Sequence, residues 1–137
     1  MGVVVDRVFL DANVLFSAAY GSPGPTRLWT LATEGQLELL TSGYATEEAR
    51  RNLDRKEQKG RLADLLSAVK TVPEPDPGLS CPDTLPPKVR PLLLAAIQAG
   101  ATHFVTGDLK QFGTYRGRRP AGVLICTLRD YLAPPKG

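Results

Sequence analysis

Two aspartates follow apolar segments that have the pattern of buried strands. Asp11 comes directly after the apolar run 8–10, and Asp108 follows the segment 102–106 after a single glycine. In an open parallel sheet, ligands bind beyond the carboxyl ends of the strands, so neighbouring strands would turn both carboxylates toward one crevice. Either aspartate alone could equally cap the helix or turn that follows it. Their equivalent positions at two strand ends favour a shared site.

A third acid, Glu48, lies in a segment with a helical pattern. Ala45, Ala49 and Leu53 recur at the spacing of one helix face. Glu48 lies on the flank of that face, whereas Glu47 lies nearly opposite it, so Glu48 is the better candidate for reaching the crevice. The alternative is that Glu48 is only a first-turn acid that interacts with the helix dipole.

Carboxylates that crowd together repel one another and require a compensating cation. Hard oxygen ligands without a nearby histidine or cysteine suit Mg²⁺ or Mn²⁺, and such an ion can activate water and stabilise a phosphoryl transition state. The sequence therefore predicts a metal site formed by Asp11, Glu48 and Asp108. Asn13 and Thr106 are expected to orient these ligands, although helix capping and strand packing explain the two residues equally well.

A basic segment follows Asp108 along the chain. It contains Lys110, Tyr115, Arg116, Arg118 and Arg119. The basic residues could hold RNA phosphates and the tyrosine could stack on a base, which would place an RNA-binding segment beside the crevice. The alternative, which the sequence slightly favours, is a solvated surface loop.

Several other chemistries find no support in the sequence. The only histidine, His103, lies inside a predicted strand and is expected to be packed, which argues against a histidine-based nuclease. No GxGxxG motif follows the first strand and no Walker-type loop occurs, which argues against dinucleotide or ATP binding. The residue two positions after Asp11 is asparagine, so the second aspartate of a haloacid-dehalogenase-like phosphatase is missing.

The elements that must position these residues alternate between strand and helix. Strands are predicted at 3–10, 37–41, 69–72, 102–106 and 123–126, and helices at 13–20, 26–34, about 46–60, 61–68, 91–100 and 128–132. Residues 73–87 contain six prolines and are expected to form an irregular loop. The alternation predicts a three-layer α/β/α sandwich with a mainly parallel sheet of about five strands.

Length and composition indicate one globular domain over residues 1–137, with 42% hydrophobic and 23% charged residues. The net charge of +3 permits a polyanionic partner without requiring one. No apolar stretch approaches the roughly 18 residues that span a bilayer, and no secretion signal is expected. Cys81 and Cys126 are far apart and are interpreted as isolated thiols of a cytoplasmic protein.

Three stretches, "FLDANVLFSA", "LTSGYATEEARRNL" and "AIQAGATHFVTGD", resemble the PIN domain family in its branch close to toxin–antitoxin toxins, over roughly residues 6–112. The resemblance implies a five-stranded parallel sheet flanked by helices and a metal-dependent nuclease acting on single-stranded RNA. It implies Asp11, Glu48 and Asp108 as the acids, with Thr106 as a hydroxyl beside the metal. It also suggests a homodimer and, for a toxin, a cognate antitoxin.

One position departs from this family pattern. The family usually has an acid just before the helix that leads into "AGA", where this chain has "LPPKVRPLLLAAI" and Val89 at the matching position. No acid lies between Thr84 and Ala101, and Asp83 would have to reach the site from the proline-rich loop. Losing one carboxylate lowers the charge that attracts a metal, or shifts the metal toward Asp11 and Asp108.

Three functional hypotheses follow. The first is a PIN-like, Mg²⁺- or Mn²⁺-dependent endoribonuclease in which an activated water attacks the phosphodiester in line. The second is a module of the same fold whose catalysis is weakened or lost at Val89 and which binds RNA or a protein partner. The third is a small phosphohydrolase of another α/β family.

Overall fold

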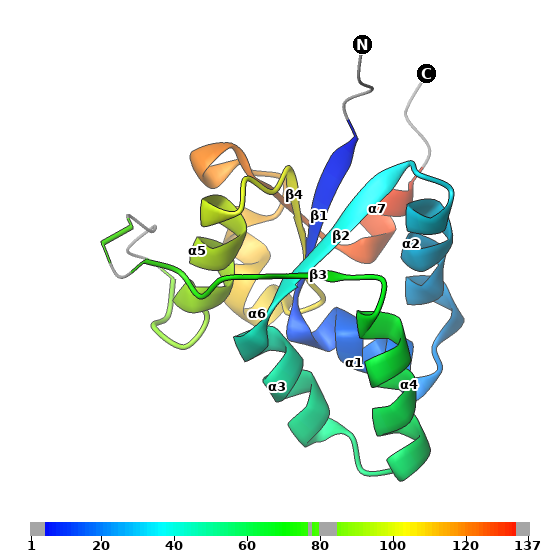
Figure 1. Cartoon of the computed structure of the whole chain (residues 1–137). Helices are drawn as coiled ribbons and strands as arrows, with labels where there is room; N and C mark the ends of the chain where they lie inside the picture. The colour runs from blue at the N-terminus through cyan, green and yellow to red at the C-terminus, as the bar shows by residue number, and fades with distance from the viewer. Residues whose placement is uncertain (1–4, 77, 80–84, 134–137) are drawn as a thin grey trace.

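The computed structural model describes residues 5–76, 78–79 and 85–133. Its centre is a five-stranded sheet with the strand order β3-β2-β1-β4-β5, in which every neighbouring pair is parallel (Figure 1). The strands are β1 (Asp6–Leu10), β2 (Leu37–Ser42), β3 (Lys70–Val72), β4 (His103–Val105) and β5 (Leu124–Cys126). The predicted α/β class with a parallel sheet is confirmed.

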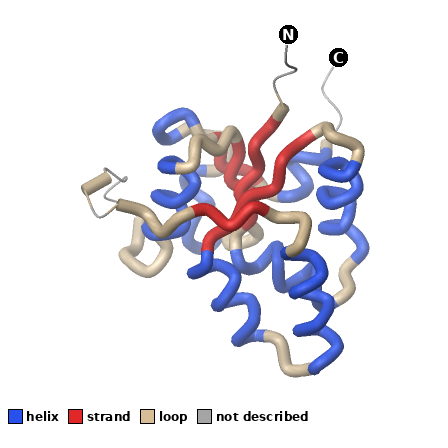
Figure 2. Tube along the Cα trace, in the orientation of Figure 1, coloured by secondary structure: helices blue, strands red, loops and turns tan. Residues whose placement is uncertain are grey.

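Helices flank the sheet, as Figure 2 shows in blue around the red strands. They are α1 (Ala12–Tyr20), α2 (Pro23–Thr33), α3 (Gly43–Asn52), α4 (Lys56–Leu66), α5 (Arg90–Gln98), α6 (Leu109–Phe112) and α7 (Leu128–Leu132), with 3₁₀ turns at Gly113–Tyr115 and Pro120–Gly122. In Figure 1, α5 and α6 lie on one side of the sheet and α2 and α4 on the other. No helix within the described ranges combines the length and apolarity that a membrane span needs.

The strand order reverses at β1. The chain passes outward from β1 through β2 to β3, and then returns to the other side of β1 as β4 and β5. In such sheets the point of reversal, beyond the carboxyl ends of the two central strands, is where ligands bind. Leu10 pairs with Val105 at those ends, so the residues that follow β1 and β4 emerge level with each other.

The central strands are apolar because helices cover both of their faces. Val8, Phe9 and Leu10 are completely buried, which explains why β1 has a continuous apolar run rather than an alternating pattern. Phe9 stacks on Phe104 across the β1–β4 pair, with ring centroids 5.5 Å apart. This packing fixes the two strands that carry the predicted acids.

Several helix boundaries differ from the sequence prediction, and two of the differences are larger than a residue or two. Helix α2 begins at Pro23 rather than residue 26, because proline is well suited to the first turn of a helix. The single helix predicted over 46–60 is wrong: α3 ends at Asn52, and α4 continues through the predicted break after Gly60. Leu53 takes an extended backbone conformation (φ −89°, ψ 131°) and is buried, so the chain turns there.

The segment after Asp108 is more ordered than a solvated loop. It forms α6 and a 3₁₀ turn, and then runs beside the outer edge of β5. The Gly117 amide donates to the Ile125 carbonyl (2.7 Å), and the Ile125 amide donates to the Arg118 carbonyl (3.0 Å). Residues 117–118 therefore satisfy backbone hydrogen-bonding groups of β5, whose outer edge would otherwise be open.

Candidate active site

A cleft of about 610 Å³ opens beyond the carboxyl ends of β1 and β4. Asp11, Glu48 and Asp108 all line it, and each comes from a different element. Asp11 is the N-cap of α1, Glu48 lies in the middle of α3, and Asp108 is the N-cap of α6. The structure thus brings the three predicted acids together in one cleft.

Asp11 is the most buried of the three acids, with 3% of its surface exposed. Its Oδ1 atom accepts a hydrogen bond from the Ala12 amide (2.7 Å). Its Oδ2 atom accepts from the Thr106 hydroxyl (2.7 Å) and from the Asn13 side-chain amide (3.2 Å). Asp11 therefore caps α1, as the alternative interpretation expects, and it also lines the cleft.

Thr106 and Asn13 also hold the loop that carries Asp108. The Thr106 hydroxyl accepts from the Asp108 amide (2.9 Å), and the Asn13 side-chain oxygen accepts from the Gly107 amide (2.8 Å). A Cβ atom at Gly107 would lie 3.3 Å from that asparagine oxygen, which is a tight contact. Asp108 in turn accepts from the Gln111 amide (3.2 Å) at the start of α6. The two strand ends are thereby linked by side-chain hydrogen bonds.

The electrostatics of the cleft oppose the ionisation of Asp11. Burial raises the pKa of Asp11 to about 6, against the lowering effect of the hydrogen bonds from Thr106 and Ala12. The carboxylates of Asp108 and Glu48 raise the pKa of Asp11 further. The site therefore combines crowded like charges with one carboxylate that is almost fully buried.

The donor chemistry of the cleft fits Mg²⁺ or Mn²⁺, because all three acids offer hard oxygen ligands. Within the described residues, no three His, Cys, Asp or Glu side chains are already grouped as a metal-binding set. Glu48 and Asp108 are partly exposed, so their side chains have room to rotate. The buried, hydrogen-bonded Asp11 is the fixed member of the set.

The position of the missing family acid lies in the same cleft. Val89 lines it, is 4% exposed, and is the N-cap of α5 without a side-chain hydrogen bond to the helix. Lys88 also lines the cleft, and its carbonyl accepts from the Tyr44 hydroxyl (3.1 Å). This wall of the site therefore presents an apolar side chain and a cation. Asp83 lies outside the described residues.

Some cleft residues were not anticipated from the sequence. Phe16, Asn52 and Gln111 line it beside the acids. Asn52 is one helical turn beyond Glu48, and Phe16 is one turn beyond the residue after Asp11. Helical spacing from the predicted acids would have indicated the first two.

The basic segment lies elsewhere. Lys110, Arg118 and Arg119 are exposed, Tyr115 is partly buried against the core, and none of the five predicted RNA-binding residues lines the cleft. Arg116 donates to both carboxylate oxygens of Asp130 (2.8 Å each), an arrangement that holds the pKa of Asp130 well below its usual range. This pair lines a second pocket of about 780 Å³ at the amino ends of β1 and β4.

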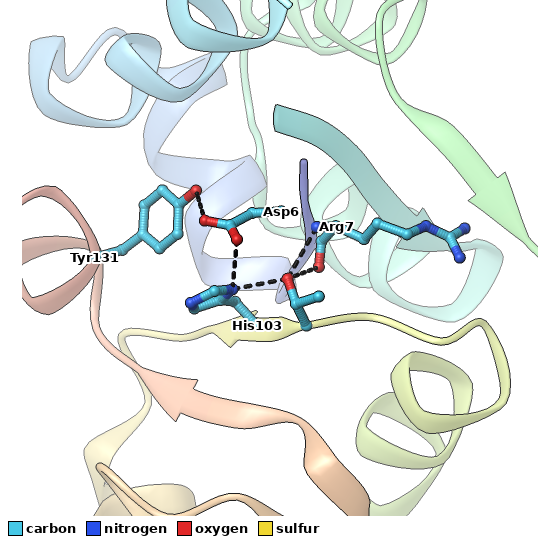
Figure 3. A network of polar contacts seen from close by, with 5 residues as sticks. Asp6, Arg7, His103 and Tyr131 are labelled. Atoms are coloured by element: carbon cyan, nitrogen blue, oxygen red, sulfur yellow. Dashed lines mark hydrogen bonds and ion pairs between the residues drawn. The ribbon is translucent and has the colours of Figure 1, made fainter. Parts of the chain in front are cut away.

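His103 lies in that second pocket and within a polar network (Figure 3). The Tyr131 hydroxyl donates to Asp6 (2.8 Å), and Nδ1 of His103 lies 2.8 Å from the Thr102 hydroxyl and 4.0 Å from Asp6. The Thr102 hydroxyl also accepts from the Arg7 amide (2.9 Å). Burial lowers the pKa of His103. The imidazole is thus far from the acidic cleft, at the opposite end of its strand.

Cys126 adds no chemistry to the cleft. Cys126 is a free, buried thiol, and burial raises its pKa to about 12. A thiol with so high a pKa is protonated at neutral pH and is a poor nucleophile or metal ligand. Cys81 lies outside the described residues.

Comparisons with known proteins agree with this geometry. The sheet order and the acidic cleft at its point of reversal define a parallel α/β protein of PIN type. A family model described as "PIN domain" matches residues 7–110, and the chain belongs to the PIN domain family.

Among solved structures, the chain is similar to VapBC2 from Rickettsia felis, crystallised bound to a DNA fragment from its promoter. The TM-score is 0.62 and the identity 16%, and the match covers 88% of this chain and 98% of that chain. At this identity, the likeness shows the fold alone. No curated protein matches the chain significantly.

Proposed function

We propose that this PIN domain is an endoribonuclease that depends on Mg²⁺ or Mn²⁺ and cleaves single-stranded RNA. The observation that carries the proposal is the meeting of Asp11, Glu48 and Asp108 in one cleft, where burial and neighbouring carboxylates raise the pKa of Asp11. Such a concentration of unpaired negative charge needs a cation, and a perturbed carboxyl group in a cleft is typical of a functional site.

The three acids have distinct tasks in this proposal. Asp11 is held rigidly by Thr106 and Asn13, and Glu48 and Asp108 complete the ligand set from two sides of the cleft. These residues would hold Mg²⁺ or Mn²⁺, which when bound would supply an activated water and stabilise the charge of the phosphoryl transition state. The hydrogen bonds of Thr106 fix the position of the Asp11 side chain relative to the Asp108 loop. Both carboxyl groups could then act on the same phosphodiester.

We further propose that the enzyme is the toxin of a toxin–antitoxin pair, acts in the cytoplasm as a homodimer, and is controlled by a cognate antitoxin protein. This rests on the sequence resemblance and on the fold shared with VapBC2, whose structure includes a promoter fragment. Copurification of the chain with the product of a neighbouring small gene would test it.

A second function has one observation in its favour. One wall of the cleft presents Val89, where the family usually has an acid, and the cationic Lys88, and both weaken the attraction for a metal. The alternative is therefore a PIN-fold module with weakened or lost catalysis that binds RNA or a protein partner.

The deciding experiment is cleavage of labelled single-stranded RNA with Mn²⁺. Asp11→Asn and Glu48→Gln are expected to lower the rate at least roughly 100-fold, since each removes a charged ligand. Glu47→Gln is the matched control, because Glu47 lies next to Glu48 on α3, is exposed and pairs with Arg50. Val89→Asp is expected to raise the rate.

The outcomes separate the two functions. RNA binding without cleavage in any variant, including Val89→Asp, would favour the binding module. Cleavage that survives both Asp11→Asn and Glu48→Gln would refute this cleft as the catalytic site.

A further inference from the structure

An aromatic pair extends from the cleft along α1. Phe16 and Tyr20 are four residues apart on the same helix face, and their rings stack with centroids 5.7 Å apart and planes at 28°. Tyr20 has 60% of its surface exposed, against 42% for Leu109, the other exposed large hydrophobic residue in the described part of the chain. An exposed ring held by a second ring has one face available for a ligand.

This pair is continuous with the acidic site. Ala12, Phe16 and Tyr20 follow one another at helical spacing, and the first two line the cleft together with Asp11. With a rise of about 1.5 Å per residue, Phe16 lies roughly 7.5 Å along the helix from Asp11, and Tyr20 roughly 6 Å further. A chain that enters the acidic site from this side would pass over both rings.

A cation flanks the outer end of the pair. Arg61 of α4 donates a hydrogen bond to the carbonyl of Ala19 (3.0 Å). The same guanidinium nitrogen would lie 3.0 Å from a Cβ atom at Gly21, so the charged group rests against the chain on both sides of Tyr20. An aromatic surface next to a guanidinium combines the two features by which proteins bind single-stranded nucleic acids.

We propose that Phe16 and Tyr20 form a stacking platform for an unpaired base of the RNA strand that enters the acidic cleft, with Arg61 close to a backbone phosphate. The proposal rests on the proposed ribonuclease function and specifies how its substrate is held. The charge favours RNA over a protein partner, since a cation at the end of an aromatic surface matches a base and its phosphate. Stacking requires a base that is not already paired, so the platform also selects single strands over duplexes.

The test measures RNA affinity without catalysis. Fluorescence anisotropy with a short labelled single-stranded RNA, in EDTA so that no cleavage occurs, is compared for the wild type, Tyr20→Leu and Tyr20→Phe. Tyr20→Leu keeps an apolar side chain but removes the ring, and is expected to weaken binding roughly tenfold or more. Tyr20→Phe keeps the ring and is expected to restore most of the affinity.

Two further measurements sharpen the result. Binding of the same sequence as a duplex should not distinguish Tyr20→Leu from the wild type, because paired bases are already stacked. A 2-aminopurine base placed along the single strand should lose fluorescence on binding the wild type and lose less on binding Phe16→Leu. Circular dichroism of each variant checks that it folds, as expected for the exposed Tyr20.

Equal affinity of wild type and Tyr20→Leu for single-stranded RNA would overturn the platform. Light scattering that shows Tyr20→Leu to be monomeric where the wild type is dimeric, at unchanged RNA affinity, would also overturn it and assign the rings to a second copy of the chain. If the Tyr20 dependence holds but Mn²⁺ supports no cleavage, only the nuclease proposal fails. If cleavage occurs but the RNA affinity is the same for wild type and Tyr20→Leu, only the platform proposal fails.

Discussion

The two ends of the central strands carry pockets of similar size and opposite electrostatics. At the carboxyl ends, the cleft of about 610 Å³ gathers Asp11, Glu48 and Asp108 with like charges. At the amino ends, the pocket of about 780 Å³ contains carboxylates that have partners: Asp130 with Arg116, and Asp6 with Tyr131. The pKa of Asp11 is raised, whereas the pKa of Asp130 is lowered.

This contrast shows that pocket volume alone does not identify the functional site. In the larger pocket the carboxylates of Asp130 and Asp6 have partners, and the hydrogen bond from Tyr131 to Asp6 joins α7 to β1. In the smaller, acidic cleft, the burial of Asp11 and the repulsion between the carboxylates remain unfavourable in the folded protein. Such unfavourable electrostatics are expected where a cation or a substrate completes the site. A threonine flanks β4 at each end and bridges to β1 or to the residue that follows it: Thr106 donates to Asp11, and Thr102 accepts from the Arg7 amide.

The largest expected effect is an opposite pH dependence of stability for Asp11→Asn and Asp130→Asn, measured by urea unfolding in EDTA. The pKa of Asp11 is about 6 when folded and 3.8 as the ordinary value, so its contribution to stability is present below pH 4 and lost as pH rises through 6. Asp11→Asn should therefore gain up to about 3 kcal/mol relative to wild type between pH 4 and pH 7.5.

Asp130→Asn should show the reverse trend. Because the pKa of Asp130 is lowered, chiefly by its hydrogen bond from Arg116, its contribution is present above the ordinary carboxyl pKa and lost at lower pH. The variant should be less stable than wild type at pH 7 and approach it in acid. Two variants with the same pH trend would refute the electrostatic contrast.

A smaller effect is expected from the two threonines. Thr106→Val removes a buried hydroxyl that serves Asp11 and Asp108, and should lower Mn²⁺ affinity roughly 10- to 100-fold by calorimetric titration. Thr102→Val is the matched control, since it removes the equivalent bridge at the other end of β4. It should lower stability but leave Mn²⁺ affinity unchanged. Equal losses of affinity would mean that Thr106 has only a structural role.

The smallest effect is expected for Tyr131→Phe. The variant loses one hydrogen bond to Asp6 in a half-buried network, which should lower the free energy of unfolding by about 1 kcal/mol. Thermal unfolding measures the loss, and Mn²⁺ titration should be unchanged. A weaker Mn²⁺ affinity would show that the two ends of the sheet are coupled.

The sequence predicted the central part of the fold, and it placed three acids that the structure brings to one cleft, for physical reasons. Strands β1 and β4 are largely buried, so the apolar segments that contain them are recognisable in the sequence. Asp11 follows β1 directly, and Asp108 follows β4 after Thr106 and Gly107. Glu48 was found from helix periodicity, and the structure places it on the cleft. Its role as a ligand, like that of the two aspartates, stays a prediction.

Other features depend on tertiary contacts that local patterns do not record. The turn at Leu53 lies in a segment rich in charged residues and helix formers, and the burial of that one leucine decides it. Arg116 was predicted beside the crevice because it follows Asp108 in sequence, but its partner Asp130 holds it at the other end of the sheet. Gln111 also lines the cleft, and no spacing from the predicted acids indicated it, because it lies in the short helix α6 that the sequence did not predict.

The hydrogen bonds between residues 117–118 and β5 have a consequence for how the protein behaves at high concentration. With that border occupied, edge-to-edge growth of the sheet from one molecule to the next can proceed only through β3. That strand has three residues, begins with an exposed lysine and is followed by Pro73, features that discourage strand addition. Both edges of the sheet therefore disfavour the addition of a strand from another molecule, which lowers the tendency to form fibril-like aggregates.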